Sequence, residues 1–449
     1  MTTLTHLKRP IFIEPAPRRI SPRWLIVGAG LLAFLLIFKL ALPSVAHLAE
    51  PLRQLIGNEA VAQLETWLFA AQDGAKQFTY AAGLAEPVAP WQPAAMIAVT
   101  TIPTELPESP TPTPTTMPSP TNSPPITIHN HNVVATVDMV TPVPPTVTPT
   151  PLPTATPSPT PWQPAALSAL GSLAGEGLWS PYILHPDAGE AVAYRTFLQP
   201  DAERPFAVVA VVAFDLTAVD LNFVLGSEEP SLPDGARGNG RIPKADNVPG
   251  KLLAAFNGGF MATHGEYGAM SQGLEVLPPK AGLATVALGR DGHIYIGRWG
   301  EDISADGDWL AWRQNAHLVV ENGTTTAETE INSLTYWSGS INGEVVTWRS
   351  GLGLSADGQT LFYFAGPSLN MPALGRAMVA AGVEQGMLLD INPYWVHFTT
   401  MHQDNDTLTA EPLLTDMEQH IDRFLRMYAR DFFYITLAPK DQDASVNVE

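Results

Sequence analysis

The chain has 449 residues, a formal net charge of −20 at pH 7, 43 prolines and no cysteine. Without cysteine it can have no disulfide framework, no thiolate-bound zinc, no iron–sulfur cluster and no cysteine nucleophile. The acidic balance disfavours binding to nucleic acid and to anionic membrane surfaces, because both carry negative charge.

An apolar run near the N-terminus predicts a transmembrane helix. Residues 25–42, LIVGAGLLAFLLIFKLAL, have Lys39 as their only charge and are nearly long enough to cross a hydrocarbon core. The charged residues within 1–24 are all basic except Glu14, so this segment is expected to stay in the cytoplasm. The prediction is a single-pass anchor in the cell membrane, with the C-terminal domain outside the cytoplasm. The alternative is a cleaved secretory signal, because Ser44-Val45-Ala46 offers a small-residue cleavage pattern.

Residues 43–86 are predicted to form one or two juxtamembrane amphipathic helices. Between residues 50 and 83, apolar side chains recur every three or four positions, with charged side chains between them. The pattern leaves three alternatives: the helices dimerise, lie on the membrane or stand in solvent.

Residues 87–165 are rich in Pro, Thr and Ser, which predicts a disordered linker of polyproline II character. At about 3.1 Å per residue, such a spacer could hold its cargo on the order of 200 Å from the membrane. The pentapeptide WQPAA brackets it, at residues 91–95 and 162–166, which suggests a duplicated linker. His129 and His131 lie within it, and two histidines in such a run are weak support for a metal site.

Residues 166–449 are the segment able to bury a large core, and they predict a single α+β domain that is strand-rich with a few helices. Turns are expected at Asn342-Gly343, at Asp357-Gly358 and at Arg290-Asp291-Gly292. Helices are too few between the strands for a parallel βαβ sheet. The predicted strands lie within residues 207–216, 221–226, 252–260, 284–299, 318–326 and 334–366.

Two later segments show helical periodicity. The first follows Asn370 and covers residues 371–382. The second begins at Thr415, an N-cap with Glu418 as its capping-box partner, and continues through Tyr428.

Three separated segments carry the candidate chemistry. Asn257-Gly258-Gly259-Phe260 closes an apolar strand, and its glycines allow the backbone to approach a ligand closely. The second segment is WRSGLGLSADG at residues 348–358, and the third is GMLLDIN at residues 386–392.

The order and strand-like context of these segments resemble the phosphodiester glycosidase family over about residues 170–437. That family is related to the animal uncovering enzyme, which removes N-acetylglucosamine from phosphodiester-linked mannose. Residues 257–260 match its N-G-G-F-type motif. Arg349, Ser350 and Gly353 match most of a second motif, in which Gly351 stands where alanine is usual. The start of its L-D-G-G-G-S motif is matched by Leu389 and Asp390, and its remainder is replaced by Ile391-Asn392-Pro393-Tyr394.

The resemblance implies hydrolysis of the bond between an anomeric carbon and a phosphate oxygen, with carbohydrate or a sugar phosphodiester as the substrate. On that basis the expected catalytic residues are Asp390 and Arg349, whose guanidinium would hold the phosphate. The alternatives are an Asx-turn for Asp390 and a surface ion pair for Arg349. The expected substrate-binding residues are Asn257, Gly258, Gly259, Phe260, His264, Glu266, Gly353 and Asn392.

No cofactor and no metal are expected. A lesser alternative is a metal site in which His397, His402 and Asp404 join Asp390, although their spacing matches no known ligand motif.

Two functions of different classes follow. The first is a membrane-anchored extracytoplasmic hydrolase of the phosphodiester glycosidase type, acting on sugar phosphodiesters or cell-surface polysaccharide. The alternative is a catalytically inactive glycan-binding surface module of the same fold, favoured by the replaced third motif and by aromatic residues that could stack on sugars, such as Trp299, Trp337 and Tyr394. A purely structural stalk protein is a third interpretation.

Overall fold

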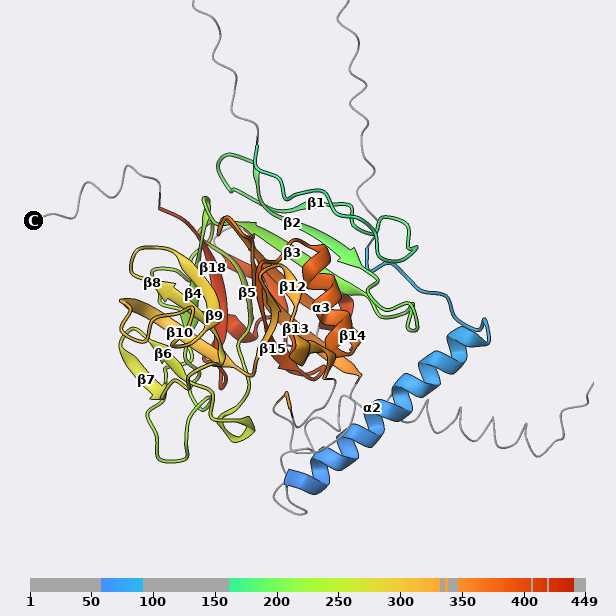
Figure 1. Ribbon diagram of the computed structural model, residues 1–449. Coiled ribbons are helices and arrows are strands. Elements are labelled where there is room, and N and C mark those ends of the chain that lie inside the picture. The colour runs from blue at the N-terminus through green and yellow to red at the C-terminus, as the bar shows by residue number, and fades with distance from the viewer. Residues whose placement is uncertain are drawn as a thin grey trace, which may run out of the picture. The chain divides into compact units, whose positions relative to one another are not determined.

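The computed structural model describes residues 58–91, 161–331, 336–337, 346–404, 407–417 and 420–439 (Figure 1). The predicted span at residues 25–42, most of the Pro-rich linker with His129 and His131, and the Asn342-Gly343 turn lie outside these ranges. The chain divides into two units, residues 95–160 and the remainder. Among the described helices, none has the length and apolar character needed to cross a membrane.

The largest sheet has eight antiparallel strands in the spatial order β1-β2-β3-β14-β13-β15-β11-β12. Its strands are β1 (Ser180–Leu184), β2 (Ala191–Leu198), β3 (Val209–Asp215), β11 (Leu318–Glu321), β12 (Thr324–Thr325), β13 (Thr347–Leu354), β14 (Thr360–Leu369) and β15 (Gln385–Ile391). Alternate residues of β3 enter different cores: Val212 and Phe214 lie in one, and Val209 and Val211 in the other. Burial on both faces explains the uninterrupted apolar run that predicted this strand.

Two further sheets have five antiparallel strands each. The order of the first is β7-β6-β10-β8-β9, with β6 (Ala269–Ser271), β7 (Leu274–Leu277), β8 (Ala284–Gly289), β9 (Ile294–Arg298) and β10 (Trp309–Asn315). The order of the second is β17-β16-β5-β18-β4, with β4 (Val219–Val224), β5 (Leu252–Asn257), β16 (Phe398–Asp404), β17 (Thr407–Pro412) and β18 (Phe432–Leu437). Strands β8 and β9 form the predicted hairpin, whose turn contains Gly292 at φ 84°.

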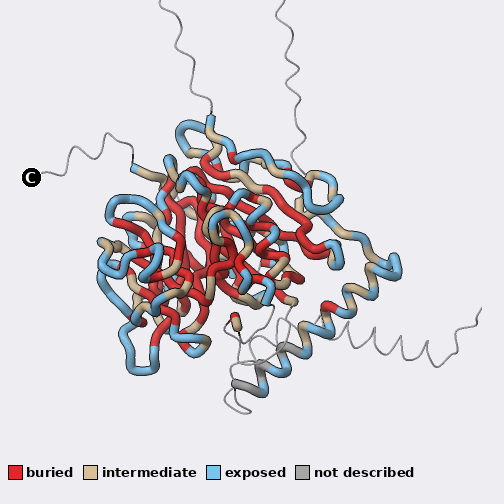
Figure 2. Tube along the Cα trace, in the orientation of Figure 1, coloured by how far each residue is buried: buried red, intermediate tan, exposed pale blue. Residues whose placement is uncertain are grey.

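The large sheet packs against the sheet that contains β5. The ring of Phe256 on β5 lies 4.8 Å from the ring of Tyr363 on β14 and 5.9 Å from that of Phe398 on β16. Phe214 of β3 approaches Phe398 at 6.2 Å. The interior strands are accordingly buried (Figure 2). Each fully buried phenylalanine contributes about 1.5–3 kcal/mol of hydrophobic free energy, so this aromatic layer is a main source of stability.

Helix α3 (Met371–Ala380) covers the other face of the large sheet (Figure 1). It begins after Asn370, whose Oδ1 accepts a hydrogen bond from Ala373 N at 2.8 Å, and Pro372 occupies its first turn. Leu374 and Met378 are fully buried in the core between the helix and the sheet. The helix predicted after Asn370 is therefore confirmed.

The helix predicted from Thr415 to Tyr428 is wrong for the described residues. The chain forms two 3₁₀ turns instead, η3 (Thr415–Met417) and η4 (Arg423–Leu425). The Arg423 guanidinium donates to the backbone oxygens of His420 and Tyr394, and such tertiary contacts override helical periodicity. Two other 3₁₀ turns are η1 (Ala262–His264) and η2 (Ala327–Glu330).

The predicted strand-rich α+β class with few helices is confirmed: the described residues hold eighteen strands and two α-helices, α2 (Asn58–Ala81) and α3. Helix α2 is the described part of the predicted juxtamembrane helices. It contacts the domain, because Asp73 forms an ion pair with Arg204 at 3.1 Å. That residues 87–165 space the domain from the membrane stays a prediction.

Candidate active site

The third motif lies in an irregular part of the pairing between β15 and β13. The register slips by one residue, so that Leu389 and Asp390 together oppose Ser350. In a regular strand, side chains point alternately to the two faces of the sheet. Such a β-bulge adds one residue and changes the direction in which its side chain points. Ser350 fixes the bulge, because its Oγ accepts a hydrogen bond from Asp390 N at 3.1 Å.

Asn257 ends β5 and connects the first motif to the other two. Its Nδ2 donates to Ser350 Oγ at 3.0 Å and to the backbone oxygen of Gly258 at 2.9 Å. Its Oδ1 accepts from the Tyr363 hydroxyl at 2.9 Å and from His397 N at 3.1 Å. Both ends of the amide therefore carry two hydrogen bonds, and the side chain fixes the point where the three motifs meet.

The two glycines of the first motif make room for a buried carboxylate. Gly258 N donates to the Asp431 backbone oxygen, and Gly259 N donates to Asp431 Oδ2, each at 3.1 Å. A Cβ on Gly258 would meet the Asp431 carboxylate, and a Cβ on Gly259 would lie 3.0 Å from the Arg313 guanidinium. The approach of the Asp431 carboxylate therefore requires glycine at position 258, and the Arg313 guanidinium leaves little room for a Cβ at position 259. The next motif residue, Phe260, is buried as well.

Two buried arginine–aspartate pairs accompany the motifs. Arg313 Nε donates to Asp431 Oδ2 at 2.7 Å, and both side chains are 1% exposed. Arg430 Nη2 lies 2.8 Å from both Asp390 Oδ2 and the backbone oxygen of Gly259. Oδ1 of Asp431 is buried and accepts no hydrogen bond from any residue in the described ranges. Two carboxylates and two guanidinium groups thus share an interior site, where each charge needs its partner.

Burial raises the pKa of the Asp390 carboxyl from 3.8 to about 7, and the neighbouring Arg430 opposes the shift. Asp390 is 3% exposed, and its Oδ1 accepts a hydrogen bond from Ile391 N at 2.7 Å. A group that titrates near neutral pH can both accept and release a proton under physiological conditions. Asp390 is thus suited to general acid–base chemistry.

Arg349, the predicted phosphate ligand, is buried on β13, and its Nε donates to the backbone oxygen of Leu369 at 3.0 Å. The alternative of a surface ion pair is therefore wrong. Burial lowers the pKa of its guanidinium to about 9. The arginine that forms an ion pair with Asp390 is Arg430, and its guanidinium carbon lies 4.5 Å from the ring centre of Trp395. The role of Arg349 in holding phosphate stays a prediction.

The loop after the first motif supplies two more of the predicted residues. His264 ends the η1 turn, and its ring meets the Phe260 ring edge-on at 6.3 Å. Glu266 is exposed and has a left-handed backbone, with φ 49°. Neighbouring Tyr267 is buried, and its backbone oxygen accepts a hydrogen bond from Arg313 Nη1 at 3.0 Å. The loop is thus joined to the buried charges.

Packing explains why residue 353 is glycine, and a turn explains the position of Asn392. A Cβ on Gly353 would lie 2.5 Å from Val383 Cγ2, so packing requires this glycine. Asn392 has φ 108°, and its Oδ1 accepts a hydrogen bond from Tyr394 N at 2.9 Å. The Asx-turn considered for Asp390 thus occurs two residues later, at Asn392.

The metal alternative has no support within the described ranges, where no three His, Asp or Glu side chains gather to hold an ion. Burial lowers the pKa of His397 to about 2, so this imidazole is neutral. His402 lies 3.1 Å from Glu411. Trp299 and Trp337 are buried, which rules them out as exposed platforms for a sugar.

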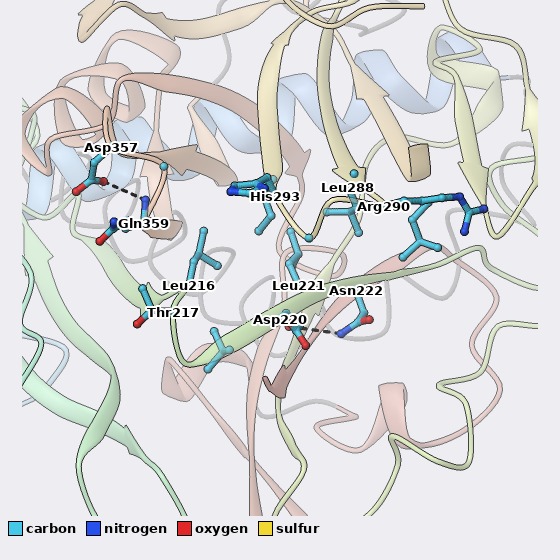
Figure 3. Close-up of a pocket in the computed structure, with 16 residues that line it drawn as sticks. Leu216, Thr217, Asp220, Leu221, Asn222, Leu288, Arg290, His293, Asp357 and Gln359 are labelled. Atoms are coloured by element: carbon cyan, nitrogen blue, oxygen red, sulfur yellow. Dashed lines mark hydrogen bonds between the residues drawn. The ribbon is translucent and has the colours of Figure 1, made fainter. Parts of the chain in front are cut away.

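A polar cavity of about 560 Å³ lies elsewhere on the domain (Figure 3). The β3–β4, β8–β9 and β13–β14 turns form it, and none of the predicted site residues lines it. Its volume is in the range of small-molecule sites. The polar side chains in its lining are Thr217, Asp220, Asn222, Arg290, His293, Asp357 and Gln359.

Arg313, Arg430 and Asp431 were not among the residues predicted from the sequence. Their only signal is position: Arg313 stands inside the apolar strand β10, and Arg430-Asp431 directly precedes the apolar strand β18. A charge at such a place is costly unless it is paired or functional.

Comparison with known proteins gives only distant structural similarity. No protein-family model and no curated protein sequence matches the chain. The chain is similar to the catalytic domain of zebrafish N-acetylglucosamine-1-phosphodiester alpha-N-acetylglucosaminidase auto-inhibited by its pro-peptide, with TM-score 0.35 and 14% identity over 58% of this chain and 87% of that one. It is also similar to a hypothetical protein from Synechocystis, with TM-score 0.31 and 8% identity over 52% of this chain and 59% of that one.

Proposed function

We propose that the chain is an extracytoplasmic hydrolase of the phosphodiester glycosidase type, anchored by residues 25–42, that acts on sugar phosphodiesters or cell-surface polysaccharide. The observation that carries the proposal is the hydrogen-bonded chain from Asn257 to Ser350 to Asp390. It joins the three motifs of the family resemblance, and it ends at the backbone N–H of Asp390, the residue whose carboxyl has a pKa of about 7.

In the proposed reaction, Asp390 accepts a proton from the attacking water. The water oxygen bonds to the anomeric carbon, and the bond from that carbon to the phosphate oxygen breaks with its electron pair going to the phosphate. Phosphate is a good leaving group, so it needs charge stabilisation more than a proton. Arg430 lies beside Asp390 and is the first candidate for that task, and Arg349 is the second.

Entry of substrate requires a movement, because Asp390 and Arg430 are both buried. The turn that carries Trp395 covers the Arg430 guanidinium. We propose that this turn moves aside when substrate binds, in the manner of other active-site loops.

The test is hydrolysis of a panel of α-linked hexose and N-acetylhexosamine phosphodiesters by the purified chain. Asp390→Asn should lower kcat at least about 100-fold, the lower end of what general acid–base catalysis contributes. Asp234→Asn, at an exposed loop position, is the control and should leave kcat unchanged. Arg430→Gln and Arg349→Gln identify the phosphate ligand, because loss of that ligand raises KM as well as lowering kcat. Equal rates for Asp390→Asn and the unmodified chain would remove Asp390 from the mechanism.

The second candidate function is glycan binding without catalysis, and the polar cavity favours it. Carboxamide, hydroxyl, carboxylate and guanidinium groups stand around leucine side chains there, which suits a neutral polyhydroxylated ligand. Titration calorimetry with mono- and disaccharides would detect such a ligand. Under this function Asn222→Ala weakens binding and Asp390→Asn does not, whereas the hydrolase function predicts the loss of turnover described above.

A further inference from the structure

Residues 58–91 are here called the N-terminal arm. Helix α2, which forms most of the arm, contacts the domain through one of its faces. Asp73 accepts hydrogen bonds from Arg204 Nε at 3.2 and 3.1 Å, and the two side chains are 11% and 16% exposed. Lys76 Nζ donates to Ser368 Oγ at 2.9 Å. The Tyr80 ring stacks on Phe206, with 4.7 Å between ring centres. The spacing of positions 73, 76 and 80 places these side chains on one face of the helix.

The arm ends at Trp91, which is partly buried and packs against the core on one face of β2. Its ring meets the Phe197 ring edge-on at 5.7 Å. The Arg195 guanidinium lies between two rings, 4.5 Å from the centre of Trp91 and 4.4 Å from that of Tyr182. A partly desolvated cation over a tryptophan face is among the stronger contacts of this kind.

The second WQPAA copy attaches to the same strand. Trp162 meets the Tyr194 ring at 5.6 Å and packs against the core on the helix α3 side, whereas Trp91 packs against the core between the sheets. Tyr194 and Arg195 are consecutive residues of β2, and their side chains point to opposite faces. The two tryptophans of the repeat therefore hold one strand from its two faces.

We infer that the N-terminal arm is a non-covalently bound ligand of its own domain, and that the loop of residues 92–160, which joins Trp91 to Pro161 in the sequence, is not needed to keep the arm in place. The binding surface consists of Arg204, Phe206 and Ser368 for α2, and of β2 for Trp91. The partner that it fits is an acidic amphipathic helix followed by a tryptophan. This inference is independent of the proposed catalytic function, because no contact involves Asp390 or its neighbours.

The inference predicts that cutting the loop leaves the two fragments associated. A site for a sequence-specific protease is inserted within residues 92–160 of the full chain, which carries an affinity tag at its N-terminus. After cleavage, the fragment with residues 161–449 should remain on the affinity resin together with the arm. Elution of that fragment from the unmodified pair at micromolar concentration would overturn the inference.

Variants test which contacts hold the fragments together. Trp91→Ala and Asp73→Arg should each speed the release of the C-terminal fragment by about tenfold or more, as loss of about 1.4 kcal/mol would do. Adding Arg204→Asp to Asp73→Arg should restore retention, because the ion pair is then reversed. The controls are Trp67→Ala and Phe78→Ala. These two side chains of α2 are exposed, so their removal should leave the rate of release of the C-terminal fragment unchanged. Release by the controls as fast as by Trp91→Ala would contradict the assigned surface. Circular dichroism of each eluted fragment separates loss of the contact from unfolding.

Discussion

The Asp390 carboxyl is held in the protein interior by a β-bulge, and its ionisation therefore depends on the fold. In the unfolded chain the carboxyl loses its proton near pH 4. In the folded chain its pKa is about 7, so between these values the folded state holds one proton more. By linkage, the Asp390 contribution to stability is present at low pH and is lost as the pH rises to about 7.

The substitution Asp390→Asn removes this titration and should change the pH dependence of stability. One proton corresponds to about 1.4 kcal/mol per pH unit within the window from pH 4 to pH 7. We expect the melting temperature of the variant, relative to the unmodified chain, to be higher at pH 8 than at pH 5. Differential scanning calorimetry at the two pH values measures the difference in melting temperature between the variant and the unmodified chain. An equal difference at both pH values would contradict the raised pKa of Asp390.

The buried His397 should change the pH dependence of folding stability in the opposite direction. Burial is the main cause of its low pKa, and Arg423 and His420 add to it. The unfolded chain binds a proton at this residue below about pH 6.5, whereas the folded chain does so only near pH 2. Stability is therefore lost as the pH falls below 6.5.

The variant His397→Phe keeps an aromatic ring beside Phe424 and removes the group that must stay neutral. The midpoint of acid unfolding should move to lower pH, as measured by circular dichroism. His293→Phe is the control, because His293 is exposed in a hairpin and should leave the midpoint unchanged. A higher midpoint for His397→Phe would contradict the linkage.

Among the elements, β13 and α3 pack so closely that a glycine is needed between them. A Cβ on Gly351 would meet the Met378 side chain, lie 3.0 Å from the Met387 backbone oxygen and 3.6 Å from Leu374 Cδ2. The Met378 side chain thus occupies the space that a Cβ at position 351 would need. We expect Gly351→Ala to lower the free energy of unfolding by about 1–3 kcal/mol, the usual cost of overpacking.

Urea unfolding measures this cost, and a second variant tests its cause. Met378→Leu shortens the side chain and should recover part of the loss in the Gly351→Ala background. Gly74→Ala is the matched control in α2, because nothing lies within 4 Å of its Cβ. That substitution should raise stability by up to about 1 kcal/mol, since alanine is the better helix former.

At the same scale, periodicity predicted the elements whose residue pattern follows from how many of their faces are buried. Strand β3 and helix α3 belong to this group, because burial on two faces gives an apolar run and burial on one face gives a period of 3.6. The region of Arg423 shows the same helical pattern but forms a 3₁₀ turn, because its guanidinium bonds to backbone oxygens that include Tyr394, 29 residues away. Local pattern carries no information on such a contact.

The candidate site was predictable in part for a similar reason. Asn257 and Asp390 lie in motifs that end or interrupt apolar strands, and such polar residues stand out in a sequence. Arg430 lies 40 residues from its partner Asp390, and its pairing is a property of the sheet arrangement. The bulge at Ser350 is equally hidden, because a register slip of one residue leaves no mark in composition.

For the whole molecule, Trp91 and Trp162 on either side of residues 92–160 contact the domain, so the length of the segment between them should hardly affect the fold. Each halving of a flexible loop lowers its closure cost by about 0.6 kcal/mol. Replacing residues 92–160 with a Gly/Ser linker about a quarter as long should therefore raise stability by about 1 kcal/mol. Thermal unfolding of the two chains measures the difference. A marked drop in melting temperature would show that the segment contributes contacts of its own.

The contacts of Trp91 and Trp162 with β2 also have a consequence for how this region changes over generations. A tether that sets a distance is under selection for its length, whereas a loop between two fixed points is not. Insertions and deletions in this segment would change the closure cost only slightly and would leave the contacts of Trp91 and Trp162 in place. Chains that share this architecture should therefore differ widely in the size of the loop while keeping a tryptophan at each of its ends.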